Sequence, residues 1–144
     1  MDNIFFEGQV LWSQIDANGH LRHSAYADIC TQARSNMMKV IGLSMERCLA
    51  AKVGPILFRE ETLYFKEVKM DEVVKVRVFL TKNDTVKSRF AIRHELLRED
   101  GTKCAQVLVE GAWMNLVERK LTVLSEDMQA YFDKIPKSDD YVQI

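Results

Sequence analysis

The sequence predicts an α+β fold in which a curved, mostly antiparallel sheet wraps around one long buried helix. One long segment, residues 24–41, is rich in apolar residues and contains neither Pro nor Gly. Later in the chain, four segments alternate as strands do and are separated by short turns. Such an order is typical of α+β proteins. No repeat or low-complexity linker divides the 144 residues, so we expect one domain spanning 1–144.

The composition excludes several classes of protein. Hydrophobic residues make up 47% of the chain and charged residues 28%, which is typical of a globular protein. A net charge of -1 argues against partners such as nucleic acid or an anionic membrane surface. No stretch approaches the roughly 20 apolar residues that span a bilayer, and the first residues do not resemble a secretory signal. The three widely spaced cysteines fit neither disulfides nor a CxxC metal site, so we expect a cytoplasmic protein without metal.

The first part of the chain predicts a strand, a loop and the long helix. Residues 7–14 form the candidate first strand, and Asn18-Gly19 is a strong turn signal. The helix is expected over 24–41, where apolar residues fall on nearly every face, so we expect it to be buried on most sides. Gly42 is expected to end it.

The remainder of the chain predicts a short helix, four strands and a last helix. The short helix covers 43–52 and is closed by Gly54-Pro55. The expected strands are 56–67, a run that alternates from Val74 to Leu80, 86–98 and 103–117, with turns at Asn83-Asp84 and Glu99-Asp100-Gly101. A last helix is expected near 125–132, with Ser125 as its N-cap.

The segment 16–26, Asp-Ala-Asn-Gly-His-Leu-Arg-His-Ser-Ala-Tyr, concentrates polar side chains where the long helix begins. With the element order, its Asp16-Ala-Asn-Gly-His20 run, His23 and Tyr26 resemble the hotdog-fold acyl thioesterases. The similarity is to the 4-hydroxybenzoyl-CoA thioesterase-like branch and to acyl-ACP thioesterases. The resemblance implies a hotdog fold, a homodimer or homotetramer, no cofactor, and hydrolysis of an acyl-CoA or acyl-carrier-protein thioester to free acid and thiol.

The resemblance also implies roles for individual residues. Asp16 would act as nucleophile or general base, and the backbone N–H at His23 would polarise the thioester carbonyl. Asn18 and His20 match positions that orient water or the carboxylate. Thioester hydrolysis needs a donor at the developing oxyanion and a base or nucleophile about 3 Å from the reacting carbon. A helix start and a loop carboxylate supply these two groups.

Because CoA and phosphopantetheine are anionic, basic residues are expected to surround the substrate tunnel. The candidate substrate-binding residues are Gly19, Tyr26, Arg59, Lys82, Lys87 and Arg89. Basic residues on a strand are more often a solvated face, so that interpretation stays open.

Simpler interpretations also stay open for the motif. Asp16 before Asn-Gly could be only a turn or capping residue, and His94 could be a core histidine. A non-catalytic acyl-binding module of the same fold is the alternative function. A hotdog hydratase is disfavoured, because the hydratase motif it would resemble has Pro where this chain has Gly19.

Overall fold

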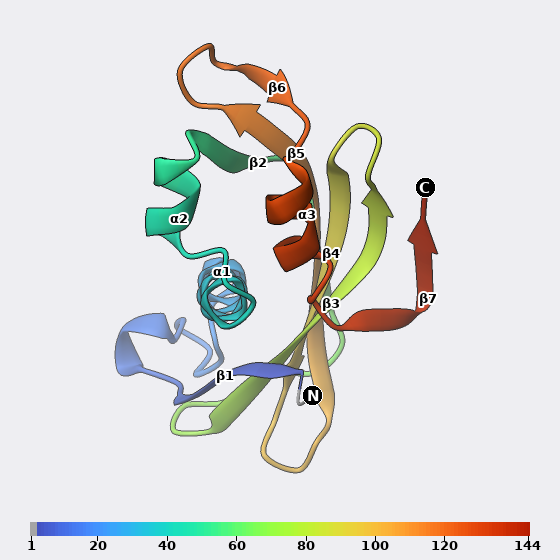
Figure 1. Cartoon of the computed structure of the whole chain (residues 1–144). Helices are drawn as coiled ribbons and strands as arrows, with labels where there is room; N and C mark the ends of the chain where they lie inside the picture. Colours follow the sequence, from blue (N-terminus) through green and yellow to red (C-terminus); the bar gives the residue numbers. More distant parts are fainter. Residues whose placement is uncertain (1–2) are drawn as a thin grey trace.

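The computed structural model describes residues 3–144 (Figure 1). Within these residues, seven strands and three α-helices follow one another, with one turn of 3-10 helix after the first strand. The elements in chain order are β1 (Ile4–Gln9), η1 (Trp12–Gln14), α1 (His23–Val40), α2 (Met45–Ala50), β2 (Val53–Tyr64), β3 (Val73–Asp84), β4 (Arg89–Leu97), β5 (Lys103–Asn115), β6 (Lys120–Thr122), α3 (Glu126–Phe132) and β7 (Lys137–Gln143).

The strands form one sheet in the order β1-β3-β4-β5-β2, with every neighbouring pair on this path antiparallel. The short strand β6 pairs with β5, and β7 runs parallel to β3. Figure 1 shows α1 nearly end-on, with the sheet curving around it and α3 beside it. The expected α+β hotdog arrangement is therefore confirmed.

The core forms where alternating strand residues meet one face of α1. In β3, the alternating side chains from Val74 to Leu80 are at most 1% exposed. The buried residues of α1 recur at helical spacing and are Ala25, Tyr26, Ile29, Cys30, Ala33 and Met37.

The expectation that most sides of α1 are buried was wrong for the single chain. A polar stripe at spacings of three and four residues is exposed to solvent, and it consists of Asp28, Thr31, Gln32, Ser35 and Lys39. The apolar residues that suggested all-round burial therefore leave one side of the helix uncovered.

The N-terminal strand begins and ends earlier than expected. After β1, the Val10 N–H still donates to the Glu72 carbonyl at 2.9 Å, and then the chain leaves the sheet. The Gln14 side chain accepts a 2.9 Å hydrogen bond from the Leu11 N–H and so stabilises the 3-10 turn. Trp12, read as a strand residue, is 84% exposed on this turn.

The predicted turn at Asn83-Asp84 was also wrong, because both residues belong to β3. The turn comes directly after them, where one Asp84 carboxylate oxygen accepts 3.0 Å hydrogen bonds from the N–H groups of Val86 and Lys87. The hairpin at 99–101 is confirmed, as is the N-cap Ser125, whose hydroxyl accepts from the Met128 N–H at 3.3 Å. The strands β6 and β7 were not predicted. Within 3–144, no helix is both long and apolar enough to cross a membrane.

Candidate functional site

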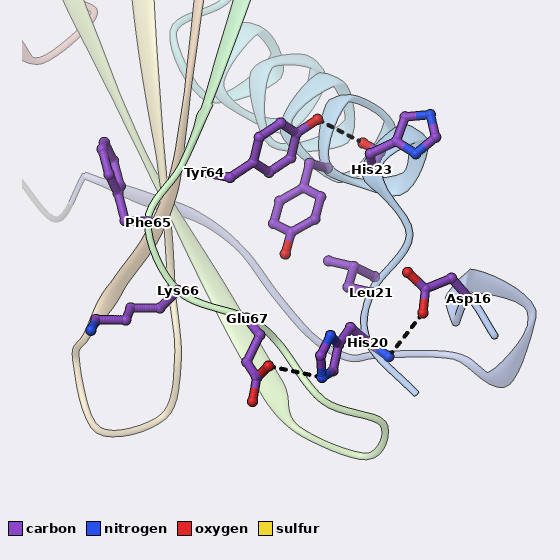
Figure 2. Close-up of a pocket in the computed structure, with 9 residues that line it drawn as sticks. Asp16, His20, Leu21, His23, Tyr64, Phe65, Lys66 and Glu67 are labelled. Atoms are coloured by element: carbon purple, nitrogen blue, oxygen red, sulfur yellow. Dashed lines mark hydrogen bonds and ion pairs between the residues drawn. The ribbon is translucent and has the colours of Figure 1, made fainter. Parts of the chain in front are cut away.

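A cavity of about 360 Å³ lies where the loop before α1 meets the end of β2 (Figure 2). It receives side chains from this loop, from the first turn of α1 and from the residues that follow β2. The lining residues are Asp16, His20, Leu21, His23, Tyr26, Tyr64, Phe65, Lys66 and Glu67. The cavity therefore brings together four of the residues that the sequence singled out.

Backbone N–H groups of its own loop hold the Asp16 carboxylate. Its Oδ1 accepts hydrogen bonds from the N–H groups of Asn18 at 2.8 Å and His20 at 3.2 Å. Gly19, with φ at +78°, supplies the left-handed residue that this tight turn requires. No group in the described part of the chain donates to Asp16 Oδ2. One oxygen thus fixes the carboxylate while the other is available, and the side chain is exposed to solvent in the single chain.

The first turn of α1 offers backbone donors beside this carboxylate. The N-cap residue Arg22 makes no side-chain capping bond, and its guanidinium instead donates to the Ser24 hydroxyl and the Ser13 carbonyl. The N–H groups of His23 and Ser24 have no acceptor among residues 3–144. These unpaired donors lie at the positive end of the helix dipole, which favours negative charge.

Two tyrosines form the aromatic side of the cavity. Tyr26 and Tyr64 meet edge to face, with ring centroids 5.1 Å apart. The Tyr64 hydroxyl donates to the His23 carbonyl at 3.4 Å (Figure 2). Burial raises the pKa of Tyr26 to about 12, and the nearby Cys104, Tyr64 and Asp16 add to this effect. Tyr26 is therefore a neutral phenol at physiological pH.

The side chains of His20 and Asn18 do not hold the Asp16 carboxylate; only their backbone N–H groups do. His20 Nε2 lies 2.8 Å from a Glu67 carboxylate oxygen, so the ring is turned toward the segment after β2 (Figure 2). The Asn18 side chain does not line the cavity.

The expected basic residues lie elsewhere in the single chain. Lys82 and Arg89 line a different cavity of about 200 Å³, where the Arg89 guanidinium lies 5.5 Å from the Phe58 ring centroid. Phe58 precedes Tyr64 by six residues in β2, a separation of roughly 20 Å in an extended strand. Lys87 is on the turn after β3. Arg59 points to carboxylates on the sheet, at 3.0 Å from Glu61 and 3.5 Å from Glu110.

Four lining residues that the sequence analysis missed follow one another from the end of β2. They are Tyr64, Phe65, Lys66 and Glu67. In the sequence, two adjacent aromatic residues followed by a Lys-Glu pair interrupt the strict alternation of the predicted strand 56–67. This interruption was the signal that the strand ends at residue 64 and that these residues serve another purpose. Within 3–144, no cluster of three or more His, Cys, Asp or Glu could hold a metal ion.

A family model described as the thioesterase-like superfamily matches residues 10–132. No match to a curated protein was found.

Solved structures share the fold. One is a hypothetical protein from Staphylococcus aureus solved in complex with CoA, at 20% identity over 96% of this chain and 89% of the other, with a TM-score of 0.85. DHNA-CoA thioesterase from Staphylococcus aureus has 20% identity, coverages of 90% and 87%, and a TM-score of 0.80. A 1,4-dihydroxy-2-naphthoyl-CoA thioesterase from Synechocystis has 18% identity, coverages of 90% and 94%, and a TM-score of 0.78.

Proposed function

The chain belongs to the thioesterase-like superfamily, and from that membership we propose that it hydrolyses an acyl-CoA thioester to a free acid and a thiol. An acyl-carrier-protein thioester is the second candidate substrate. The names of structural relatives, which include CoA thioesterases and a protein in complex with CoA, support CoA as the first candidate.

The observation that carries the proposal is the pairing of Asp16 with the first turn of α1 at one cavity. Asp16 Oδ2 is free to act, and the N–H groups of His23 and Ser24 are free to donate. We assign to Asp16 either attack on the thioester carbonyl carbon or removal of a proton from an attacking water. In both routes the carbonyl oxygen gains negative charge, which the helix-start donors stabilise. The carbon–sulfur bond then breaks, and the thiolate leaves and takes up a proton, from Asp16 in the general-base route and from water in the nucleophilic route. In the nucleophilic route the acyl group is left on Asp16 as an anhydride, which a water molecule hydrolyses to release the free acid and restore the carboxylate.

The aromatic side of the cavity suits the acyl part of the substrate. We assign Tyr26 and Tyr64 to this wall, because their rings provide apolar surface and the Tyr26 hydroxyl remains able to donate a hydrogen bond. Gly19 serves the substrate indirectly, by allowing the turn that fixes Asp16.

We propose that the protein works as a homodimer or homotetramer. The strand β2 ends the sheet, so one of its edges is unpaired among the residues that the structure describes, and it exposes Leu57, Phe58 and Leu63. Long apolar edge strands are normally paired or covered. None of the four basic candidates lines the Asp16 cavity of its own chain; they are Arg59, Lys82, Lys87 and Arg89. A role for them in binding CoA phosphates therefore requires a second copy of the chain.

One observation favours a second candidate, the non-catalytic acyl-binding module. Asp16 Oδ1 accepts two hydrogen bonds from its own loop. A carboxylate that served only to hold this turn would take no part in catalysis. The two candidates differ in what happens to a bound thioester.

The experiment measures the release of free thiol from short, long and aromatic acyl-CoA substrates by the wild type and by Asp16→Asn. Asn keeps the oxygen that accepts from Asn18 and His20 but loses the charge, so we expect a fall of at least about a hundredfold in kcat/KM. Asp100→Asn is the matched control, since Asp100 also accepts a 2.9 Å bond from the Thr102 N–H within a hairpin loop. Equal rates in wild type and Asp16→Asn would remove Asp16 from the reaction. Binding without hydrolysis of any CoA or carrier substrate would favour the module.

A further inference from the structure

A second cavity, of about 110 Å³, lies between α1, α3 and three strands of the sheet. The rings of Phe90, Trp113 and Phe132 form one wall, with centroids 5.4 to 6.3 Å apart. The full lining is Arg34, Met38, Pro55, Leu57, Phe90, Ile92, Trp113 and Phe132. It shares no residue with the Asp16 cavity, and Arg34 lies 11 residues beyond His23 on α1, roughly 16 Å along the helix.

Arg34 is the only charged residue of this lining. One of its guanidinium nitrogens lies 3.1 Å from His94 Nε2. His94 Nδ1 lies 2.8 Å from the Val107 carbonyl, to which it must donate, so Nε2 is the ring's acceptor. Burial, and then the Arg34 charge, lower the pKa of His94 to about 4. His94 is therefore neutral at physiological pH and does not compensate the positive charge.

No carboxylate compensates it at close range either. Among residues 3–144, no carboxylate oxygen lies within 4 Å of the Arg34 guanidinium. Glu60 favours the charged form from farther away, yet burial outweighs it and lowers the pKa of Arg34. A guanidinium has five N–H donors, and among the described residues 3–144 only the contact to His94 uses one of them.

A partly buried charge without a close counterion is costly, whereas a bidentate contact to a carboxylate is among the strongest that Arg makes. We propose that this cavity binds a carboxylate carried on a compact aromatic or apolar body. Arg34 donates to the carboxylate, and the body packs against Phe90, Trp113 and Phe132. The carboxylate has two chemical sources: a free carboxylic acid, or a second carboxylate at the far end of a bound acyl group. Only the second source rests on the proposed thioesterase function.

The binding test uses the fluorescence of Trp113 in a Trp12→Phe background, because the only other tryptophan is exposed. Benzoate and its neutral counterpart benzamide are the probes. We expect benzoate to change the fluorescence saturably and benzamide to bind at least about tenfold more weakly. Arg34→Met is expected to weaken benzoate binding by at least about tenfold. Equal binding of the two probes, or no saturable change, would overturn the proposal. One of these results is also expected if a second copy of the chain supplies the counterion of Arg34, so that case overturns the proposal as well.

Two further variants separate loss of the site from loss of the fold. Arg47→Met removes an exposed arginine that lies over Tyr131, outside both cavities, and is expected to bind benzoate as the wild type does. Arg34→Lys keeps the charge without the planar fork, so we expect benzoate binding between that of wild type and Arg34→Met. Benzoate binding by Arg34→Met equal to that of wild type would also overturn the proposal. The comparison of benzoate with benzamide needs no variant, so it decides the question even if Arg34→Met does not fold.

Hydrolysis then distinguishes the two sources. Acyl-CoA substrates that end in a carboxylate are compared with their methyl esters. If the carboxylate belongs to the acyl group, Arg34→Met lowers kcat/KM for the acid and leaves the ester unchanged. If the ligand is a free acid, Arg34→Met weakens benzoate binding and lowers both rates equally or neither. A wild type that hydrolyses no thioester would contradict the proposed function, while the fluorescence result would still decide the carboxylate site.

Discussion

His20 Nε2 lies 2.8 Å from a carboxylate oxygen of Glu67, and this contact joins the loop that carries Asp16 to the segment after β2. The backbone already connects the same two segments, because the Leu21 N–H donates to the Val68 carbonyl at 2.7 Å. The side chains of His20 and Glu67 are 37% and 46% exposed. The backbone hydrogen bond therefore holds the two walls of the cavity together, and the exposed His20–Glu67 pair adds a second contact between them at the cavity's edge.

The first prediction concerns the strength of that pair. In a double-mutant cycle of His20→Ala and Glu67→Ala, we expect a coupling free energy below about 1 kcal/mol, because solvent screens exposed pairs. Urea unfolding of the four proteins measures it, and high salt should reduce it further. A coupling well above this value would show that the pair, rather than the backbone, holds the walls together.

The second prediction is a loss of stability in mild acid caused by His94. The pKa of His94 falls from its ordinary 6.5 to about 4 in the folded protein, because burial and the Arg34 charge oppose protonation. The unfolded chain therefore binds more protons between these values. The stability contributed by neutral His94 is fully present above pH 6.5. The free energy of unfolding then falls by up to about 3 kcal/mol as the pH decreases toward 4. Urea unfolding between pH 7.5 and 4 measures it. His94→Gln should flatten this slope, and an unchanged slope would contradict the assignment.

The third prediction compares two glycines in left-handed turns. Gly19 and Gly101 have φ values of +78° and +86°, and a Cβ added to either would meet no atom within 4 Å. Alanine at either position should therefore cost about 1 kcal/mol from backbone strain alone. Only Gly19→Ala should also reduce thioester hydrolysis, since Gly19 shapes the loop that holds Asp16. Equal activity of the two variants would contradict the assigned role of this loop.

The fourth prediction concerns the contact between β5 and β2 at Gly111. A Cβ there would lie 2.1 Å from the Ile56 carbonyl oxygen and 2.8 Å from the Phe90 ring, so backbone must move. We expect Gly111→Ala to lower the free energy of unfolding by about 2 kcal/mol or more. In Gly54→Ala the closest atom, at 3.1 Å, belongs to the flexible Leu116 side chain, so the loss should be much smaller. Thermal unfolding of both variants checks the difference.

The sequence predicted the fold where one strong pattern determined the structure. Regular alternation from Val74 to Leu80 and the uninterrupted helix after Ser24 were sufficient to identify β3 and α1. The prediction failed where tertiary contacts override local signals. Asn83-Asp84 has the composition of a turn, yet both residues extend β3, which pairs there with β4 and β7.

The candidate site was predictable only along one segment. Residues 16–26 are contiguous, so the motif indicated Asp16, His20, His23 and Tyr26 without any knowledge of pairing. Tyr64 and Glu67 reach the same cavity only because β2 pairs with β5 and returns the chain to the start of α1. For the same reason the sequence could not show how far the basic residues near the β3–β4 turn lie from Asp16, because in the single chain that turn is at the opposite end of the sheet.

The shared edge of β3 has a consequence for the chain while it is being synthesised. β1 covers the part of that edge from Val73 to Arg77, and β7 covers the part near Leu80 to Asn83. The second part is covered only after residues 137–143 have been synthesised. Until then, that part of the β3 edge is an unpaired template for neighbouring chains. The two parts of this edge of β3 are therefore covered at different times, first by a strand that precedes α1 and later by a strand that follows α3.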